Sequence, residues 1–140
     1  MPDIRILCDR AIELAGQGRF DEAILVMNSV IRTDSNNPSI WYNKGLILHK
    51  QEKYTDAVNC FAQAADRDPG FIDALYNKGI TPMKLGKYNQ AIRVFDAIIK
   101  QEPKNRQART AWKQANEALL TKIAPVSPAS DIQTRLVKEK

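Results

Sequence analysis

The sequence holds few of the residues that enzymes use for chemistry. Its 140 residues include one histidine, His49, and two cysteines, Cys8 and Cys60. A lone histidine without a nearby cysteine supplies neither a catalytic triad nor a metal site. The six glycines form no glycine-rich loop of the kind that holds phosphates. We therefore expect a protein without enzymatic activity, and with no metal and no cofactor.

Long hydrophobic runs are also missing. No apolar run approaches the roughly 18 residues that a membrane-spanning helix needs, and residues 1–5 lack the basic-then-apolar order of a signal peptide. The two cysteines are far apart and fit no disulfide framework, so a reducing compartment suits them. These observations predict a soluble, cytoplasmic protein that has no membrane partner.

What the chain does contain is an internal repeat. The sequence of residues 41–45, Trp-Tyr-Asn-Lys-Gly, returns at residues 75–79 as Leu-Tyr-Asn-Lys-Gly. The same spacing relates the residues that follow, which are Tyr54, Ala57, Phe61, Ala64 and Pro69 in one copy and Tyr88, Ala91, Phe95, Ile98 and Pro103 in the next. A fainter copy upstream has Phe20, Ala23, Met27 and Val30. A fixed period of this length predicts an array of stacked units.

The quoted residues resemble the tetratricopeptide repeat, a 34-residue helix-turn-helix unit with Trp, Leu, Gly, Tyr, Ala, Phe and Pro at set intervals. The resemblance covers roughly residues 3–122. It implies an all-α fold, an α-solenoid that winds as a right-handed superhelix. The expected parts are repeats at about 4–35, 38–69 and 72–103, a capping helix at 106–122, and a linker and C-terminal tail at 123–140.

Turn and cap residues predict seven helices. Asn37 before Pro38, and Asn105, can cap the helices that follow them. Pro82 lies inside a helical pattern, where it removes a backbone donor at a cost of about 3 kcal/mol, so that helix should kink or end early. The expected helices span residues 3–16, 20–33, 38–51, 54–67, 71–85, 88–101 and 106–122.

The C-terminal tail has a pattern of its own. Residues 124–130 form a linker that two prolines stiffen. Ser130 and Gln133 could form a capping box that opens a short helix over residues 131–140, with an apolar stripe at Ile132, Leu136 and Val137. Such a helix is marginal alone in water. Either it docks on its own body or on a neighbouring molecule, or the tail is disordered.

In the family that the chain resembles, the first helix of each repeat lines a concave groove. Tyrosine gives broad contact, asparagine can bond to a peptide backbone, and lysine attracts acidic side chains, so this set suits a peptide. The predicted groove residues are Tyr42, Asn43, Leu46, His49, Lys50, Tyr76, Asn77, Ile80, Met83 and Lys84. Asp9 and Ile12 extend the lining into the first copy. The alternative is that Tyr42 and Tyr76 only pack between repeats.

One subgroup of the family grips a C-terminal carboxylate with two asparagines and several basic residues. Only Asn43 matches that pattern well, and Cys8, Ile12, Asp73 and Asn77 stand at its other positions. Asp73 would repel a carboxylate. We therefore expect no carboxylate clamp and interpret the chain as a scaffold or adaptor that binds a peptide segment or helix of a partner protein.

Two other functions remain open from the sequence. Residues 1–35 carry a net charge of −2 and residues 104–120 carry +3, which could support head-to-tail self-association or contact through the tail. The basic end could instead bind nucleic acid, with an aromatic residue stacking on a base. Its candidate residues are Lys104, Arg106, Arg109, Trp112 and Lys113. The helical spacing of Trp112 from Ala108 and Ala115 argues against this, because it places Trp112 at the end of the core.

Overall fold

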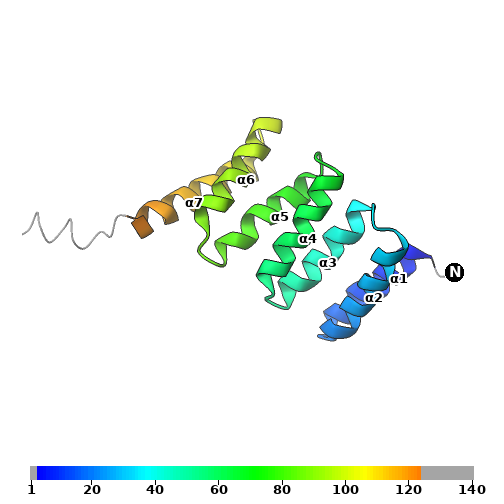
Figure 1. Ribbon diagram of the computed structural model, residues 1–140. Helices are drawn as coiled ribbons and strands as arrows, with labels where there is room; N and C mark the ends of the chain where they lie inside the picture. The colour runs from blue at the N-terminus through cyan, green and yellow to red at the C-terminus, as the bar shows by residue number, and fades with distance from the viewer. Residues whose placement is uncertain (1–2, 124–140) are drawn as a thin grey trace, which may run out of the picture.

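The computed structural model describes residues 3–123, and over these residues the protein is built from helices and short loops (Figure 1). The helices lie within two residues of their predicted bounds. They are α1 (Ile4–Gly16), α2 (Phe20–Thr33), α3 (Pro38–Lys50), α4 (Tyr54–Arg67), α5 (Ile72–Met83), α6 (Tyr88–Gln101) and α7 (Arg106–Ile123). None of these seven is long and apolar enough to cross a membrane. The predicted linker and tail helix, 124–140, lie outside the described residues.

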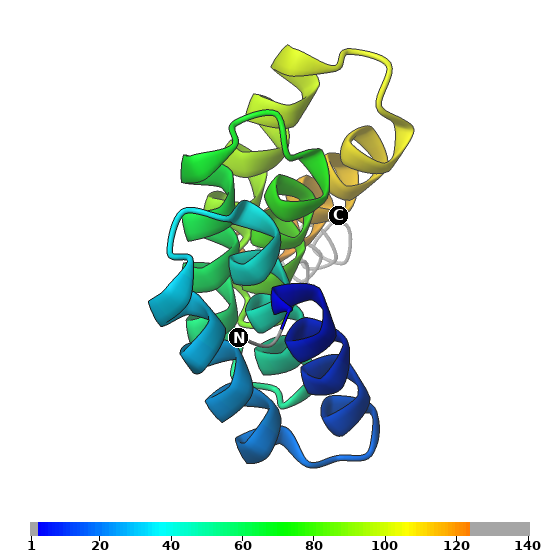
Figure 2. The same cartoon turned by 90° about the vertical axis from the view of Figure 1, so that its right-hand side faces the viewer.

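The helices form two layers. α1 packs on α2, α3 on α4 and α5 on α6, as three successive pairs. Figure 2 shows the first helices of the pairs, α1, α3 and α5, on one side of the array and the second helices, α2, α4 and α6, on the other. α7 packs on α6 in the way that α5 packs on α4. The predicted all-α solenoid is confirmed.

Inside each pair, a small residue on the first helix faces a large one on the second. A Cβ atom added to Gly45 would lie 2.6 Å from the Phe61 ring, and one added to Gly79 would lie 2.6 Å from the Phe95 ring. Both rings are fully buried. These glycines therefore set how closely the two helices of a pair approach, as their spacing in the sequence indicates.

The first helices of the three pairs end in the same way. Gly18, Glu52 and Gly86 occupy equivalent positions in the three repeats and have positive φ angles of 79°, 62° and 72°. The N–H group of the residue after each one donates to a carbonyl inside the preceding helix, at 2.9 Å each time. This is the Schellman type of helix end, in which glycine avoids backbone strain. Glu52 is thus the strained member of the set.

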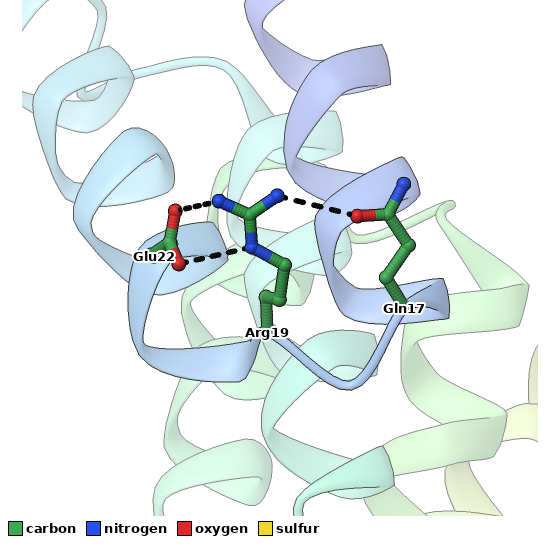
Figure 3. Close-up of polar contacts among 3 residues, drawn as sticks. All are labelled: Gln17, Arg19 and Glu22. Carbon is green, nitrogen blue, oxygen red and sulfur yellow. Dashed lines mark hydrogen bonds and ion pairs between the residues drawn. The ribbon is translucent and has the colours of Figure 1, made fainter.

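The turn between α1 and α2 adds side-chain bonds of its own (Figure 3). The Arg19 guanidinium bonds to both carboxylate oxygens of Glu22, with its Nε atom 3.0 Å from Oε1, and its Nη1 atom lies 3.4 Å from Gln17 Oε1. The hydrogen bond from Arg19 lowers the pKa of Glu22. Because the pair is exposed, it orients the turn rather than holding the fold together.

Pro82 ends α5 early, as predicted. α5 stops at Met83, one residue before the position that matches the last residue of α3. The carbonyl of Pro82 still accepts the N–H of Lys87 at 2.9 Å, and Leu48 accepts that of Lys53 in the same way. The proline therefore shortens the helix but preserves the turn that follows it.

The loops between pairs are also tied to the helices. Asn37 caps α3 by accepting the N–H of Ser39 at 3.0 Å, and Asn105 accepts the N–H of Ala108 at 2.9 Å at the start of α7, so both predicted caps are confirmed. Loop carbonyls at three equivalent positions accept side-chain donors. The acceptors and donors are Ser35 with Trp41 and Arg67, Pro69 with Gln101, and Pro103 with Arg109. Position 35 is a serine where the later repeats have Pro69 and Pro103, and its carbonyl accepts side-chain hydrogen bonds as theirs do.

Candidate functional site

Nine of the ten predicted groove residues lie on α3 and α5, in the layer of first helices (Figure 2), and Lys84 directly follows the last residue of α5. None of the ten is buried. The side chains of Leu46, Lys50 and Lys84 are exposed. The other seven side chains are half-buried; these are Tyr42, Asn43, His49, Tyr76, Asn77, Ile80 and Met83. The layer of first helices thus has a few exposed side chains, which are surrounded by half-buried ones.

An apolar row runs along this layer. Ile12, Leu46 and Ile80 occupy equivalent positions in successive repeats and lie on α1, α3 and α5. Ile12 is 48% exposed and Leu46 is 37% exposed, so solvent reaches both. Lys50 and Lys84 follow the row by one helical turn and are exposed as well. A ligand that crosses the helices would meet apolar contacts beside a positively charged margin.

Tyr42 and Asn77 connect neighbouring repeats. The Asn77 Nδ2 group donates to the Tyr42 hydroxyl at 3.1 Å, and the Tyr42 ring lies 4.9 Å from that of Phe71 and 5.7 Å from that of Phe61. Burial, and then the charge of Asp73, raises the pKa of Tyr42. These two residues therefore help to hold the third repeat against the second while their edges remain accessible.

The equivalent pair one repeat earlier carries different residues. Cys8 and Asn43 precede Tyr42 and Asn77 by one repeat period. Burial, and then the charge of Asp9, raises the pKa of Cys8, and burial likewise raises the pKa of Cys60. Both thiols are free and buried. They are accordingly core residues with little tendency to ionise.

His49 is held by a residue that the sequence analysis did not single out. Its Nδ1 atom lies 3.3 Å from Thr81 Oγ1, and that hydroxyl donates to the Asn77 carbonyl at 2.7 Å. Because the hydroxyl proton is used there, the Nδ1–H group donates and Nε2 is left as an acceptor. Burial, and then the charge of Lys84, lowers the pKa of His49, which favours the neutral ring.

Thr81 could have been found from the repeat. It is 1% exposed, and the equivalent position in the second repeat is the buried Ile47. A threonine at an apolar position indicates a specific polar partner. Here that partner is His49, which comes from the preceding first helix.

The basic C-terminal end is organised by α7. Trp112 is half-buried and packs against the core of the last repeats. Lys113 is exposed and stands one repeat period after Gly79, at the position where glycine admits a phenylalanine ring in the earlier pairs. The polar outer face expected of a terminal helix is therefore present, and Trp112 closes the core beneath it.

Solved structures share this architecture. The first TPR domain of human RPAP3 has a TM-score of 0.75 and 21% identity, over 87% of this chain and 96% of that chain. The second TPR domain of human RPAP3, in complex with the HSP70 peptide SGPTIEEVD, has a TM-score of 0.70 and 25% identity, over 81% and 98%. MamA from Desulfovibrio magneticus RS-1 has a TM-score of 0.73 and 24% identity, over 84% and 67%.

Sequence comparisons agree with the structural ones. No significant match to a curated protein is found. Two family models described as tetratricopeptide repeat match residues 8–70 and residues 48–116. Taken with the repeated helix pairs, these matches show that the chain belongs to the tetratricopeptide repeat family.

Proposed function

We propose that the chain is a non-catalytic protein-interaction module, a scaffold or adaptor that binds a peptide segment or helix of a partner protein along its first helices. The observation that carries this proposal is the accessible apolar row of Ile12, Leu46 and Ile80 beside Lys50 and Lys84. A row that recurs once in every repeat can meet successive side chains of one ligand. The HSP70 peptide in the complex of the second TPR domain of RPAP3 is a precedent within the family.

The proposed ligand is an internal segment rather than a chain end. Asp73 is exposed in the first turn of α5, and its charge contributes to the raised pKa of Tyr42, so it lies near Tyr42 at one end of the proposed groove. A negative charge there would repel a terminal carboxylate. Lys50 and Lys84, at the other end of the helices, favour a ligand with acidic side chains on that side.

The exposed residues give the sharpest test. Peptides would be selected from a displayed random library on the full chain, and the affinity of the best peptide would be measured by calorimetry. Leu46→Asp should weaken binding about tenfold or more, because it places a charge in the apolar row. Leu46 is chosen over Tyr42 or Asn77 because those two also hold repeats together.

Leu25→Asp is the matched control. Leu25 is 68% exposed on α2, in the other layer, so the same change should leave peptide affinity unaltered. Equal affinities for the wild type and Leu46→Asp would contradict the proposed groove. Loss of binding in Lys113→Glu alone would move the function to the basic end of the array.

A further inference from the structure

The outer layer contains a cleft that the proposed groove does not use. It lies between α2 and α4, over α3, and has a volume of about 610 Å³. Its apolar lining comes from Ile24, Leu25, Trp41 and Leu48, and its charged lining comes from Asp21, Asp56, Lys44 and Lys53. An apolar cleft with charged residues of this kind suits an amphipathic segment.

The cleft is particular to the first two repeats. At the equivalent place between α4 and α6 the hollow measures about 120 Å³, and α4 packs more closely on α5 than α2 does on α3. Leu25 is 68% exposed at the cleft, whereas the equivalent positions carry the polar residues Asn59 and Arg93. The first repeat thus places an apolar side chain where the others place polar ones.

A series of hollows joins this cleft to the end of α7. The hollow at that end is lined by Leu119 and Lys122 of α7, and by Lys87 and Gln90. Lys87 and Gln90 also line the 120 Å³ hollow. Asn59 in turn is shared by that hollow and the cleft. The three hollows therefore adjoin one another along the outer face, and this row of hollows forms a track from the end of α7 to the cleft.

The chain continues past α7 by a segment long enough to follow this track. Lys122 Nζ lies 3.3 Å from the carbonyl of Gly86, so α7 ends beside the α5–α6 turn. α7, α6, α5 and α4 pack in succession, which places α4 within about 30 Å of α7 at 8–10 Å per packed pair. The eight steps from Ile123 to Asp131 can span up to roughly 28 Å when extended, and a helix over residues 131–136 would add about 8 Å.

We propose that residues 131–140 of the same chain dock in the cleft between α2 and α4. Ile132 and Leu136 are spaced to meet the cleft on one side of a helical turn, with Leu136 against Leu25 and Trp41. Arg135 and Lys138 then lie beside Asp21 and Asp56, and the same lining also contains Lys44 and Lys53. Residues 1–35, which supply α2, carry −2 and residues 121–140 carry +2, so long-range attraction favours the same docking.

The adjacent face of α7 is a poor alternative for the tail. A second helix of a fourth pair would have to pack where Gly45 and Gly79 stand in earlier pairs, and Lys113 occupies that position with an exposed charged side chain. Burying this lysine without a partner is costly. The hollow on this face of α7 measures about 580 Å³, and its apolar lining is Ile99 and Trp112, whereas four apolar side chains line the cleft.

Photocrosslinking of the full chain tests the docking directly. Leu136 is replaced with p-benzoylphenylalanine (Leu136→benzoylphenylalanine), dilute protein is irradiated, and the crosslinked peptides are mapped by mass spectrometry. Crosslinks should join position 136 to α2, α3 or α4 at the mass of one chain. Leu25→Asp should lower their yield by roughly tenfold, and Leu46→Asp, the same change on the other layer, should leave the yield unaltered.

Three outcomes would overturn the proposal. The first is an equal yield in all three proteins, and the second is crosslinking to helices outside the cleft. The third is cleft crosslinks that appear only at the mass of two chains, because the occupant would then be the tail of a second copy. Since Leu25→Asp acts on the cleft and Leu46→Asp on the groove, failure of this docking is distinguishable from failure of the proposed function.

Discussion

The first repeat and the two that follow share one period but pack their second helices differently. In the later repeats a buried phenylalanine ring meets a glycine, Phe61 with Gly45 and Phe95 with Gly79. In the first repeat the equivalent buried residues are Met27 and Ala11. The flexible methionine accommodates a methyl group that the rigid ring would not.

The junctions between repeats differ as well. The outer cleft measures about 610 Å³ between the first and second repeats and about 120 Å³ between the second and third. The common period thus preserves contacts within a pair, while spacing between pairs varies with the side chains that fill the gap. Predictions about single positions can be made by transferring a residue from one repeat to the next.

The largest expected effect comes from moving the alanine of the first repeat into the second. Gly45→Ala places a Cβ atom 2.6 Å from a buried ring and should lower the free energy of unfolding by about 2 kcal/mol, measured by urea denaturation. Phe61→Met should cost less in the Gly45→Ala background than alone, because the pair then matches the first repeat.

Gly16→Ala is the matched control for that substitution. No atom lies within 4 Å of a Cβ atom at Gly16, so alanine there should be neutral or stabilise by up to about 1 kcal/mol through helix propensity. Equal effects at the two glycines would mean that the close approach to Phe61 carries no energetic weight.

A smaller effect, in the opposite direction, is a gain in stability when the third repeat receives the leucine that the other two repeats have. Leu14 and Leu48 are equivalent to Pro82, and the proline leaves the Lys78 carbonyl without its helical donor. Pro82→Leu should raise stability by about 1 kcal/mol and the melting temperature by roughly 3–6 °C, measured by thermal unfolding. Pro38→Leu should give no such rise, because Pro38 begins α3 and displaces no helical bond. An unchanged melting temperature in Pro82→Leu would remove the penalty assigned to Pro82.

The smallest effect concerns the helix ends. Glu52 has a φ of 62° where the other two repeats have glycine. Glu52→Gly should therefore raise the free energy of unfolding by about 0.5–1 kcal/mol, and Gly86→Ala should lower it by about 1 kcal/mol. Both changes are measured from denaturation midpoints. A loss of stability in Glu52→Gly would show that the glutamate side chain offsets its backbone strain.

Features that depend on a few neighbouring residues were predictable from the sequence. Asn37 and Asn105 cap helices as expected because a cap involves only the adjacent turn. The early end of α5 follows from the missing N–H of Pro82. The repeat period also indicates on which helix, or next to which helix, each predicted groove residue lies, while their role in binding stays a prediction.

Features that depend on distances between helices were not predictable. The bond between Asn77 and Tyr42 joins residues 35 apart, and their sequence pattern fitted a groove role equally well. The outer cleft reflects the separation of α2 from α4, to which no single residue corresponds. Leu25 was nevertheless a usable signal, since it is apolar where the other repeats have asparagine and arginine.

Lys113 determines how this array could be lengthened by design. An additional helix pair inserted between α6 and α7 would keep α7 as the terminal element and leave its polar face in water. A pair completed by appending a helix after α7 would first require Lys113→Gly, so that an aromatic ring could enter. Because of this one side chain, helix pairs can be added before α7 without further change, whereas a helix added after α7 requires Lys113 to be replaced.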